Sequence, residues 1–181
     1  MLSIDLALSE LTEGGVTVLG IPIPSSSPVF LSIVGVHVAA GIVCVVSGLV
    51  AMLARKAAGR HPRAGSVYFW SLLVVFVSMA ALSTIRWPHD NALLALGIVS
   101  FTAAVVGRAA RRRGEVRLLR VHVVGMSVSY IVLLTAFYVD NGPHLPLWRE
   151  LPEWAFWVLP GVVGAPLLIR VLRKHPLLTN N

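Results

Sequence analysis

The sequence predicts an all-α protein, a polytopic membrane helical bundle with five transmembrane helices. Of its 181 residues, 56% are hydrophobic and only 13% are charged, and the mean hydropathy is +0.81. Soluble domains carry about 25% charged residues, so the charges here are too few to cover a soluble exterior. The run 29–54 contains 26 residues and no formal charge. About 20 apolar residues are enough to cross a bilayer as a helix.

Four further apolar runs follow, and they set the expected limits of one membrane domain. Residues 1–28 contain three acids, no Lys or Arg, and Gly, Pro and Ser residues that are typical of turns, so we expect an extracytoplasmic tail. Residues 29–174 form the expected bundle, and 175–181 an expected cytoplasmic tail. The expected spans are 29–54, 67–85, 91–107, 118–139 and 154–172. Pro160 and Pro166 interrupt the last span and predict a kink there.

The distribution of Lys and Arg predicts the orientation of the bundle. Thirteen of the 15 basic residues lie in the first loop, in the third loop or at the C-terminal end, whereas only Arg86 and Arg149 lie on the other side. Because cytoplasmic loops carry the excess of Lys and Arg, we expect the N-terminus outside and the C-terminus in the cytoplasm. We expect the protein to be a multi-pass protein of a cell inner membrane or plasma membrane.

The formal charge of +7 is explained by this topology. We expect anionic lipid as a partner at the cytoplasmic face, since each basic residue near a charged membrane surface contributes about 1 kcal/mol. We expect no nucleic-acid partner, because no aromatic or glycine-rich reading surface accompanies the arginines.

The sequence contains none of the common catalytic motifs. It has no Gly-rich phosphate loop, no GxSxG and no HExxH. Cys44 is the only cysteine, which excludes an intrachain disulfide. No acid lies deep within an expected span, which weakens the interpretation as a proton-coupled transporter. Whether the protein is an enzyme stays open.

Histidines in the expected spans are the main candidates for a functional site. In the first span, His37 shares one helical face with the small residues Gly41, Cys44 and Gly48. In the fourth span, His122 shares one face with Gly125 and Ser129. A glycine beside a histidine leaves room for the edge of a flat cofactor such as heme. Stripes of small residues also allow membrane helices to pack closely, and a lone histidine can hydrogen-bond across their interface. The sequence leaves both interpretations open.

The expected depths of the histidines argue against one shared cofactor. His37 lies about 12 Å from the outer boundary and His122 about 6 Å from the inner one. In a core about 30 Å thick their depths differ by about 12 Å, so we expect separate sites. His61, in the first cytoplasmic loop, is an expected neighbour of His122, while His89 or His144 could approach His37. The candidate cofactor-binding residues are therefore His37, His122 and His61, and no metal site is predicted.

A spaced set of residues resembles a family of small bacterial multi-helix membrane proteins, known mainly as a domain of unknown function. The residues that carry the resemblance lie within 29–138: His37, Gly41, Gly48, Lys56, His61, Gly65, Tyr68 and His122. That family is loosely similar to heme-carrying membrane cytochromes and ferric-reductase-like bundles. The resemblance implies a helical bundle with a heme or quinone site. In this chain Pro62 follows His61, at a position where the pattern has a basic residue. This departure weakens the interpretation of His61 as a ligand.

Three functions follow as alternatives. The first is a heme- or quinone-linked redox protein for electron transfer, with His37 and His122 in separate sites. The second is a cofactor-free accessory subunit, packed against a membrane protein partner or a second copy of the chain. The third is a small-molecule carrier that uses the fifth span. For the bundle, we expect the first and fourth spans to pack side by side through their small-residue faces.

Overall fold

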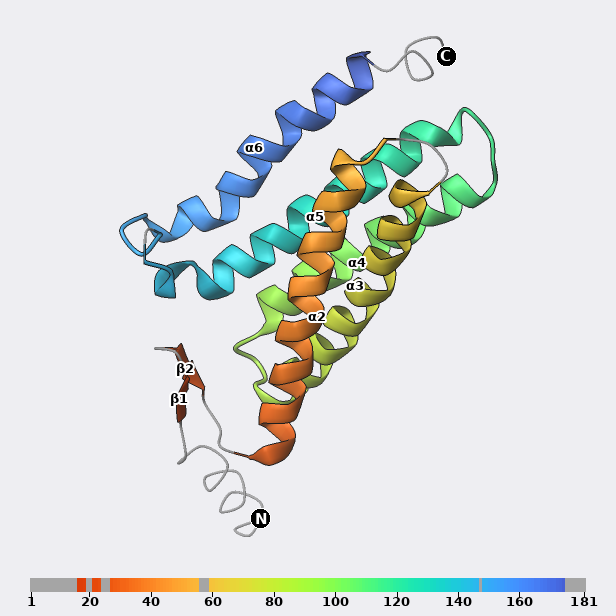
Figure 1. Ribbon diagram of the computed structural model, residues 1–181. Coiled ribbons are helices and arrows are strands. Elements are labelled where there is room, and N and C mark those ends of the chain that lie inside the picture. The colour runs from red at the N-terminus through yellow and green to blue at the C-terminus, as the bar shows by residue number, and fades with distance from the viewer. Residues whose placement is uncertain (1–15, 19–20, 24–26, 56–58, 147, 175–181) are drawn as a thin grey trace.

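The computed structural model describes residues 16–18, 21–23, 27–55, 59–146 and 148–174, and it shows five long helices (Figure 1). They are α2 Pro28–Leu53, α3 Arg60–Ile85, α4 Asn91–Arg112, α5 Leu118–Asn141 and α6 Glu153–Lys174. A short 3-10 turn, η1 Gly142–His144, follows α5. All five helices are long and apolar enough to cross a membrane. The predicted helical bundle with five candidate transmembrane helices is confirmed.

Two helices extend well beyond the expected spans. The second helix, α3, begins at Arg60 rather than at residue 67, and α4 continues to Arg112 rather than ending at 107. An apolar run shows only which residues are hydrophobic enough to contact lipid. A helix can continue beyond that run, because Arg and Ala are good helix formers. The extension places His61 in the first turn of α3 and not in a loop.

The prolines of the fifth span do not divide it into two helices. The last helix, α6, is continuous from Glu153 to Lys174 with Pro160 and Pro166 inside it. Membrane helices tolerate proline where neighbouring groups satisfy the freed backbone carbonyls. Pro160 is buried and Pro166 is exposed.

A small hairpin precedes the bundle, where the sequence indicated only turns. Strand β1, Val16–Val18, pairs with antiparallel β2, Ile21–Ile23, in the register Val16 opposite Ile23. Valine, threonine and isoleucine favour extended backbone. Other parts of the expected tails, including residues 1–15 and 175–181, lie outside the described residues, as does Lys56.

The bundle is built from two helical hairpins of consecutive helices. Helix α2 packs along α3, α4 packs along α5, and contacts between α3 and α4 join the two pairs. Helix α6 packs mainly along α5, so it lies at the edge of the bundle (Figure 1). The end of the bundle that holds the α2–α3 and α4–α5 connections is called the arginine-rich end below.

Buried polar groups tie the four central helices together. The Tyr68 hydroxyl of α3 lies 2.6 Å from the Ser129 hydroxyl of α5. Ser100 of α4 donates to the Ser129 carbonyl at 2.9 Å, and the Cys44 thiol of α2 contacts the Tyr68 carbonyl at 3.6 Å. All four residues are buried. Because lipid offers no hydrogen-bond partners, this network favours association of these helices.

Contrary to what the sequence had suggested, the small-residue faces of α2 and α5 do not pack against each other over their whole length. Gly48 of α2 does face α5, where its α-carbon lies against the Tyr130 ring, and the Tyr130 hydroxyl donates to the Val45 carbonyl at 3.0 Å. In the part of the chain that the structure describes, no atom of another helix lies within 4 Å of the position that a Cβ would take at Gly41. Gly125 packs against the backbone of α4 and not against α2. The expected pairing of α2 with α5 is therefore right only around Gly48.

Candidate functional site

The structure brings together two of the three predicted site residues at the arginine-rich end. The rings of His61, in the first turn of α3, and His122, near the start of α5, have centroids 6.5 Å apart. Their planes are nearly perpendicular, at 88°. The expectation that His61 is a neighbour of His122 therefore agrees with the geometry.

Each of these two rings is oriented by a backbone carbonyl. His61 donates from Nδ1 to the Ala51 carbonyl of α2 at 2.8 Å, and His122 donates from Nδ1 to the Gly107 carbonyl of α4 at 2.9 Å. A carbonyl oxygen can only accept, so Nδ1 carries the proton and the lone pair of each neutral ring is at Nε2. Metal-ligating histidines commonly use this arrangement, which fixes the ring and raises the basicity of the ligating nitrogen.

The position of His122 depends on a contact between two glycines. A Cβ at Gly125 would lie 2.7 Å from the Ala103 carbonyl oxygen and 2.9 Å from the Gly107 α-carbon. Only glycine allows α4 and α5 to approach this closely, and the approach brings the Gly107 carbonyl within reach of His122. Gly125 therefore serves helix packing and leaves no room for a cofactor.

Open space lies beside His61 instead. Gly65 follows His61 by one helical turn, and among the described residues no atom outside its own part of the helix lies within 4 Å of the position that its Cβ would take. Residues four apart lie on one helical face. The sequence suggested that the glycine beside His122 leaves room for the edge of a cofactor. In the structure, the glycine with open space at its Cβ position is Gly65, beside His61.

The site lies in a region of unbalanced positive charge. Arg60 and Arg63, on either side of His61, are exposed. Within the part of the chain that the structure describes, both ion pairs lie at the opposite end, Arg86 with Asp90 at 3.3 Å and Arg149 with Glu150 at 3.1 Å. The arginine-rich end therefore favours an anionic group.

His37 belongs to a different place in the bundle. Its Nδ1 donates to the Ser78 hydroxyl at 2.9 Å, and that hydroxyl donates in turn to the Val74 carbonyl at 2.7 Å. Ser78 lies in the second half of α3, whereas His61 lies in its first turn. His37 consequently does not meet His122, as the depth argument predicts, and its hydrogen bond joins α2 to α3.

Two acidic residues at the end of the bundle opposite the arginine-rich end were not singled out by the sequence. Asp90 is buried at 5% exposure beside Arg86, and α5 continues to Asn141, so Asp140 lies in its last turn. Asp140 is close enough to His37 for electrostatic interaction. Arg86 and Asp90 lie in the turn between α3 and α4 and not on one helix, so their spacing gave no signal for the ion pair. The end of α5 was not visible in the apolar run.

Comparison with protein-family models, with curated proteins and with solved structures finds no match. The resemblance to heme-carrying membrane proteins thus stays a prediction. Among the described residues, no group of three or more His, Cys, Asp or Glu side chains could hold a metal ion. A metal at the histidine pair would have to bring further ligands of its own, as the iron of a heme does.

Proposed function

We propose that this chain is a small membrane redox protein of the heme- or quinone-linked kind, with a heme bound through His61 and His122. The observation that carries the proposal is the 6.5 Å separation of the two ring centroids. Imidazole nitrogens bind transition metals at about 2.0–2.1 Å, the value for zinc, so two rings that held one metal would have centres about 6 Å apart. The observed separation is close to that value.

The surrounding residues fit a heme. Open space beside Gly65 can accept a macrocycle edge. The carbonyls of Ala51 and Gly107 hold the two rings in the tautomer whose Nε2 can ligate. A bound heme would supply one-electron chemistry, with a potential set by the residues that hold it and by its surroundings. We place this site on the cytoplasmic side, following the charge distribution.

A cofactor-free accessory subunit is the second candidate, and the hydrogen bonds favour it. The three candidate histidines each use Nδ1 to join neighbouring helices, through Ser78, Ala51 and Gly107. Interhelical hydrogen bonds of this kind contribute about 0.6–2 kcal/mol each. Such histidines would stabilise a bundle that serves a partner by packing alone.

A visible absorption spectrum of the protein in detergent, supplied with heme, separates the two candidates. We expect a heme band in the wild type and in His37→Ala, and a band that is lost or strongly shifted in His61→Ala and His122→Ala. His37→Ala is the matched control, since it also removes an interhelical hydrogen bond. Circular dichroism of each variant verifies that it remains helical.

Two results would overturn the heme proposal. A folded wild type that takes up no heme would favour the accessory subunit. Equal loss of the band in His37→Ala and His122→Ala would place the cofactor elsewhere in the bundle.

A further inference from the structure

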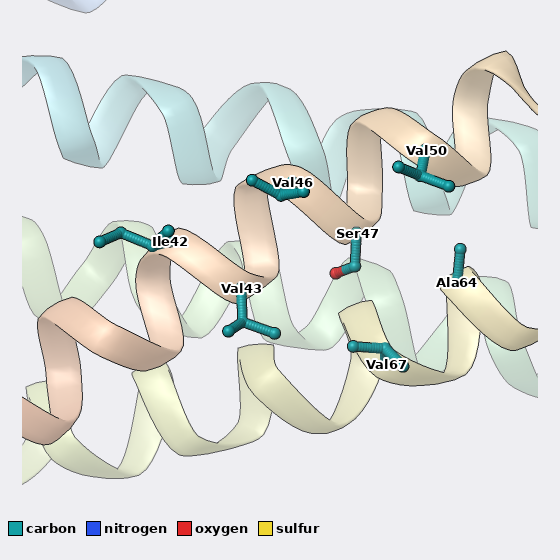
Figure 2. A pocket seen from close by; sticks show the side chains of 7 residues that line it. All are labelled: Ile42, Val43, Val46, Ser47, Val50, Ala64 and Val67. Carbon is teal, nitrogen blue, oxygen red and sulfur yellow. The ribbon is translucent and has the colours of Figure 1, made fainter.

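A shallow groove runs between α2 and α3 on the outside of the bundle (Figure 2). It has a volume of about 460 Å³, and its walls include Ile42, Val46 and Val50 of α2 and Ala64 and Val67 of α3. Ser47 is the one polar residue in the lining, and its hydroxyl donates to the Cys44 carbonyl at 3.2 Å. The groove therefore offers mainly contact to hydrocarbon.

The groove opens toward the arginine-rich end. From Ile42 to Val50 it follows α2 for about 12 Å, at 1.5 Å per residue. Val50 lies within one turn of Leu53, the last residue of α2, and Ala64 lies one turn after Arg60, the first residue of α3. The apolar walls thus end close to the polar boundary of the bundle.

Two arginines continue the groove wall beyond this boundary. Arg60, Ala64 and Val67 are spaced i, i+4, i+7 and share one face of α3, and Arg63 is one turn before Val67. Both arginines are exposed. Neither belongs to an ion pair among the residues that the structure describes. An elongated apolar surface therefore ends at two cationic side chains.

We propose that this groove binds an anionic phospholipid, with one acyl chain between α2 and α3 and the headgroup phosphate at Arg60 and Arg63. Basic pockets between membrane helices bind anionic headgroups, and guanidinium groups bind phosphate through paired hydrogen bonds. The groove alone would accept any acyl chain, so the arginines supply the selectivity for charge. This lipid site is independent of the proposed heme.

Native mass spectrometry of the detergent-solubilised protein tests the site. The protein is titrated with phosphatidylglycerol or with phosphatidylcholine of the same acyl chains, and retained lipid is counted. We expect one phosphatidylglycerol to be retained in preference to phosphatidylcholine. Arg60→Gln and Arg63→Gln should each weaken the preference about fivefold, and the double variant about 25-fold.

Two controls separate this site from general surface effects. The double variant Arg111→Gln, Arg112→Gln removes two exposed charges from the same end of the bundle but from α4, and it should keep the preference. Ala64→Trp fills the groove and should abolish retention of phosphatidylglycerol, whereas Val162→Trp on the exposed face of α6 should not. If Ala64→Trp does not fold, Val46→Trp, at a more exposed groove position, replaces it.

Several results would overturn the proposal. Equal retention of the two lipids would show that the headgroup is not recognised. An equal effect of the α3 and α4 double variants would show diffuse attraction to surface charge. Unchanged lipid retention in the folded groove-filling variant would place the lipid elsewhere, and a wild-type dimer that this variant dissociates would make a second copy the occupant.

Discussion

Gly48 is the residue that determines how closely α2 approaches α5. A Cβ there would collide with the Tyr130 ring and would lie 3.0 Å from the Tyr68 ring. The Tyr130 hydroxyl reaches the Val45 carbonyl only because this position has no side chain. Gly41, two turns earlier on the same helix, has no neighbour within 4 Å of its Cβ position.

Replacing Gly48 by Leu should destabilise the bundle. The larger side chain must displace Tyr130 and break its hydrogen bond, and overpacking of this kind costs about 1–3 kcal/mol. Thermal unfolding followed by circular dichroism in detergent measures the effect. Gly41→Leu is the matched control and should unfold near the wild-type temperature; equal behaviour of the two variants would mean that the Gly48 face meets lipid.

The candidate histidines are recognisable from the sequence, whereas their partners are not. An imidazole in an apolar run is conspicuous because few other polar groups accompany it. The partners of His61 and His122 are main-chain carbonyls of Ala51 and Gly107, and every residue has a carbonyl. Only the packing of the helices decides which one a ring reaches.

At the scale of helices, α4 and α5 approach each other so closely that their backbones are in contact. Gly107 and Gly125 face each other, and a Cβ at Gly107 would lie 3.1 Å from the Met126 nitrogen. The obstructing atoms at both glycines are backbone atoms, which cannot rotate away as a side chain can. A methyl group here must therefore separate the two helices.

Gly125→Ala should lower stability by about 1–3 kcal/mol and weaken the hydrogen bond from His122 to Gly107. Gly35→Ala, where the Cβ meets nothing within 4 Å, should be neutral or slightly stabilising because Ala is the better helix former by about 1 kcal/mol. Chemical unfolding in mixed micelles measures both. A Gly125→Ala variant as stable as Gly35→Ala would contradict the backbone contact.

The number and type of the helices follow from the sequence, but their limits do so only in part. Hydropathy reports the residues that suit lipid, and it identifies all five helices. It does not detect the polar turns that extend them, such as the first turns of α3 from Arg60 and the last turns of α4 to Arg112. His61 was expected in a loop for this reason.

At the scale of the whole molecule, the orientation in the membrane is the firmest expectation from the charges. Cys44→Ala removes the only cysteine, and single cysteines are then introduced at Glu115, between α4 and α5, and at His144 in η1. A membrane-impermeant thiol reagent should label Glu115→Cys only from the cytoplasm and His144→Cys only from outside. Labelling of both positions from one side would contradict five crossings.

The choice of partner for each helix could not be predicted. The sequence expected Gly125 to face α2, because both helices carry stripes of small residues. Gly107 of α4 offers such a residue as well, and the structure pairs Gly125 with it. Small-residue faces are interchangeable by pattern alone, so the close fit of the complete bundle decides between them.

The pairing of consecutive helices has a consequence for how the chain assembles during synthesis. Helix α3 folds back on α2, and α5 on α4, so most of the packing joins segments close in sequence. Contacts local in sequence have a low entropic cost of loop closure and form early. Synthesis adds about 5–20 residues per second, so the first hairpin can close seconds before α5 exists. Helix α6 packs mainly along α5, which is complete before α6 is synthesised. The order of synthesis therefore matches the order in which the helices can pack.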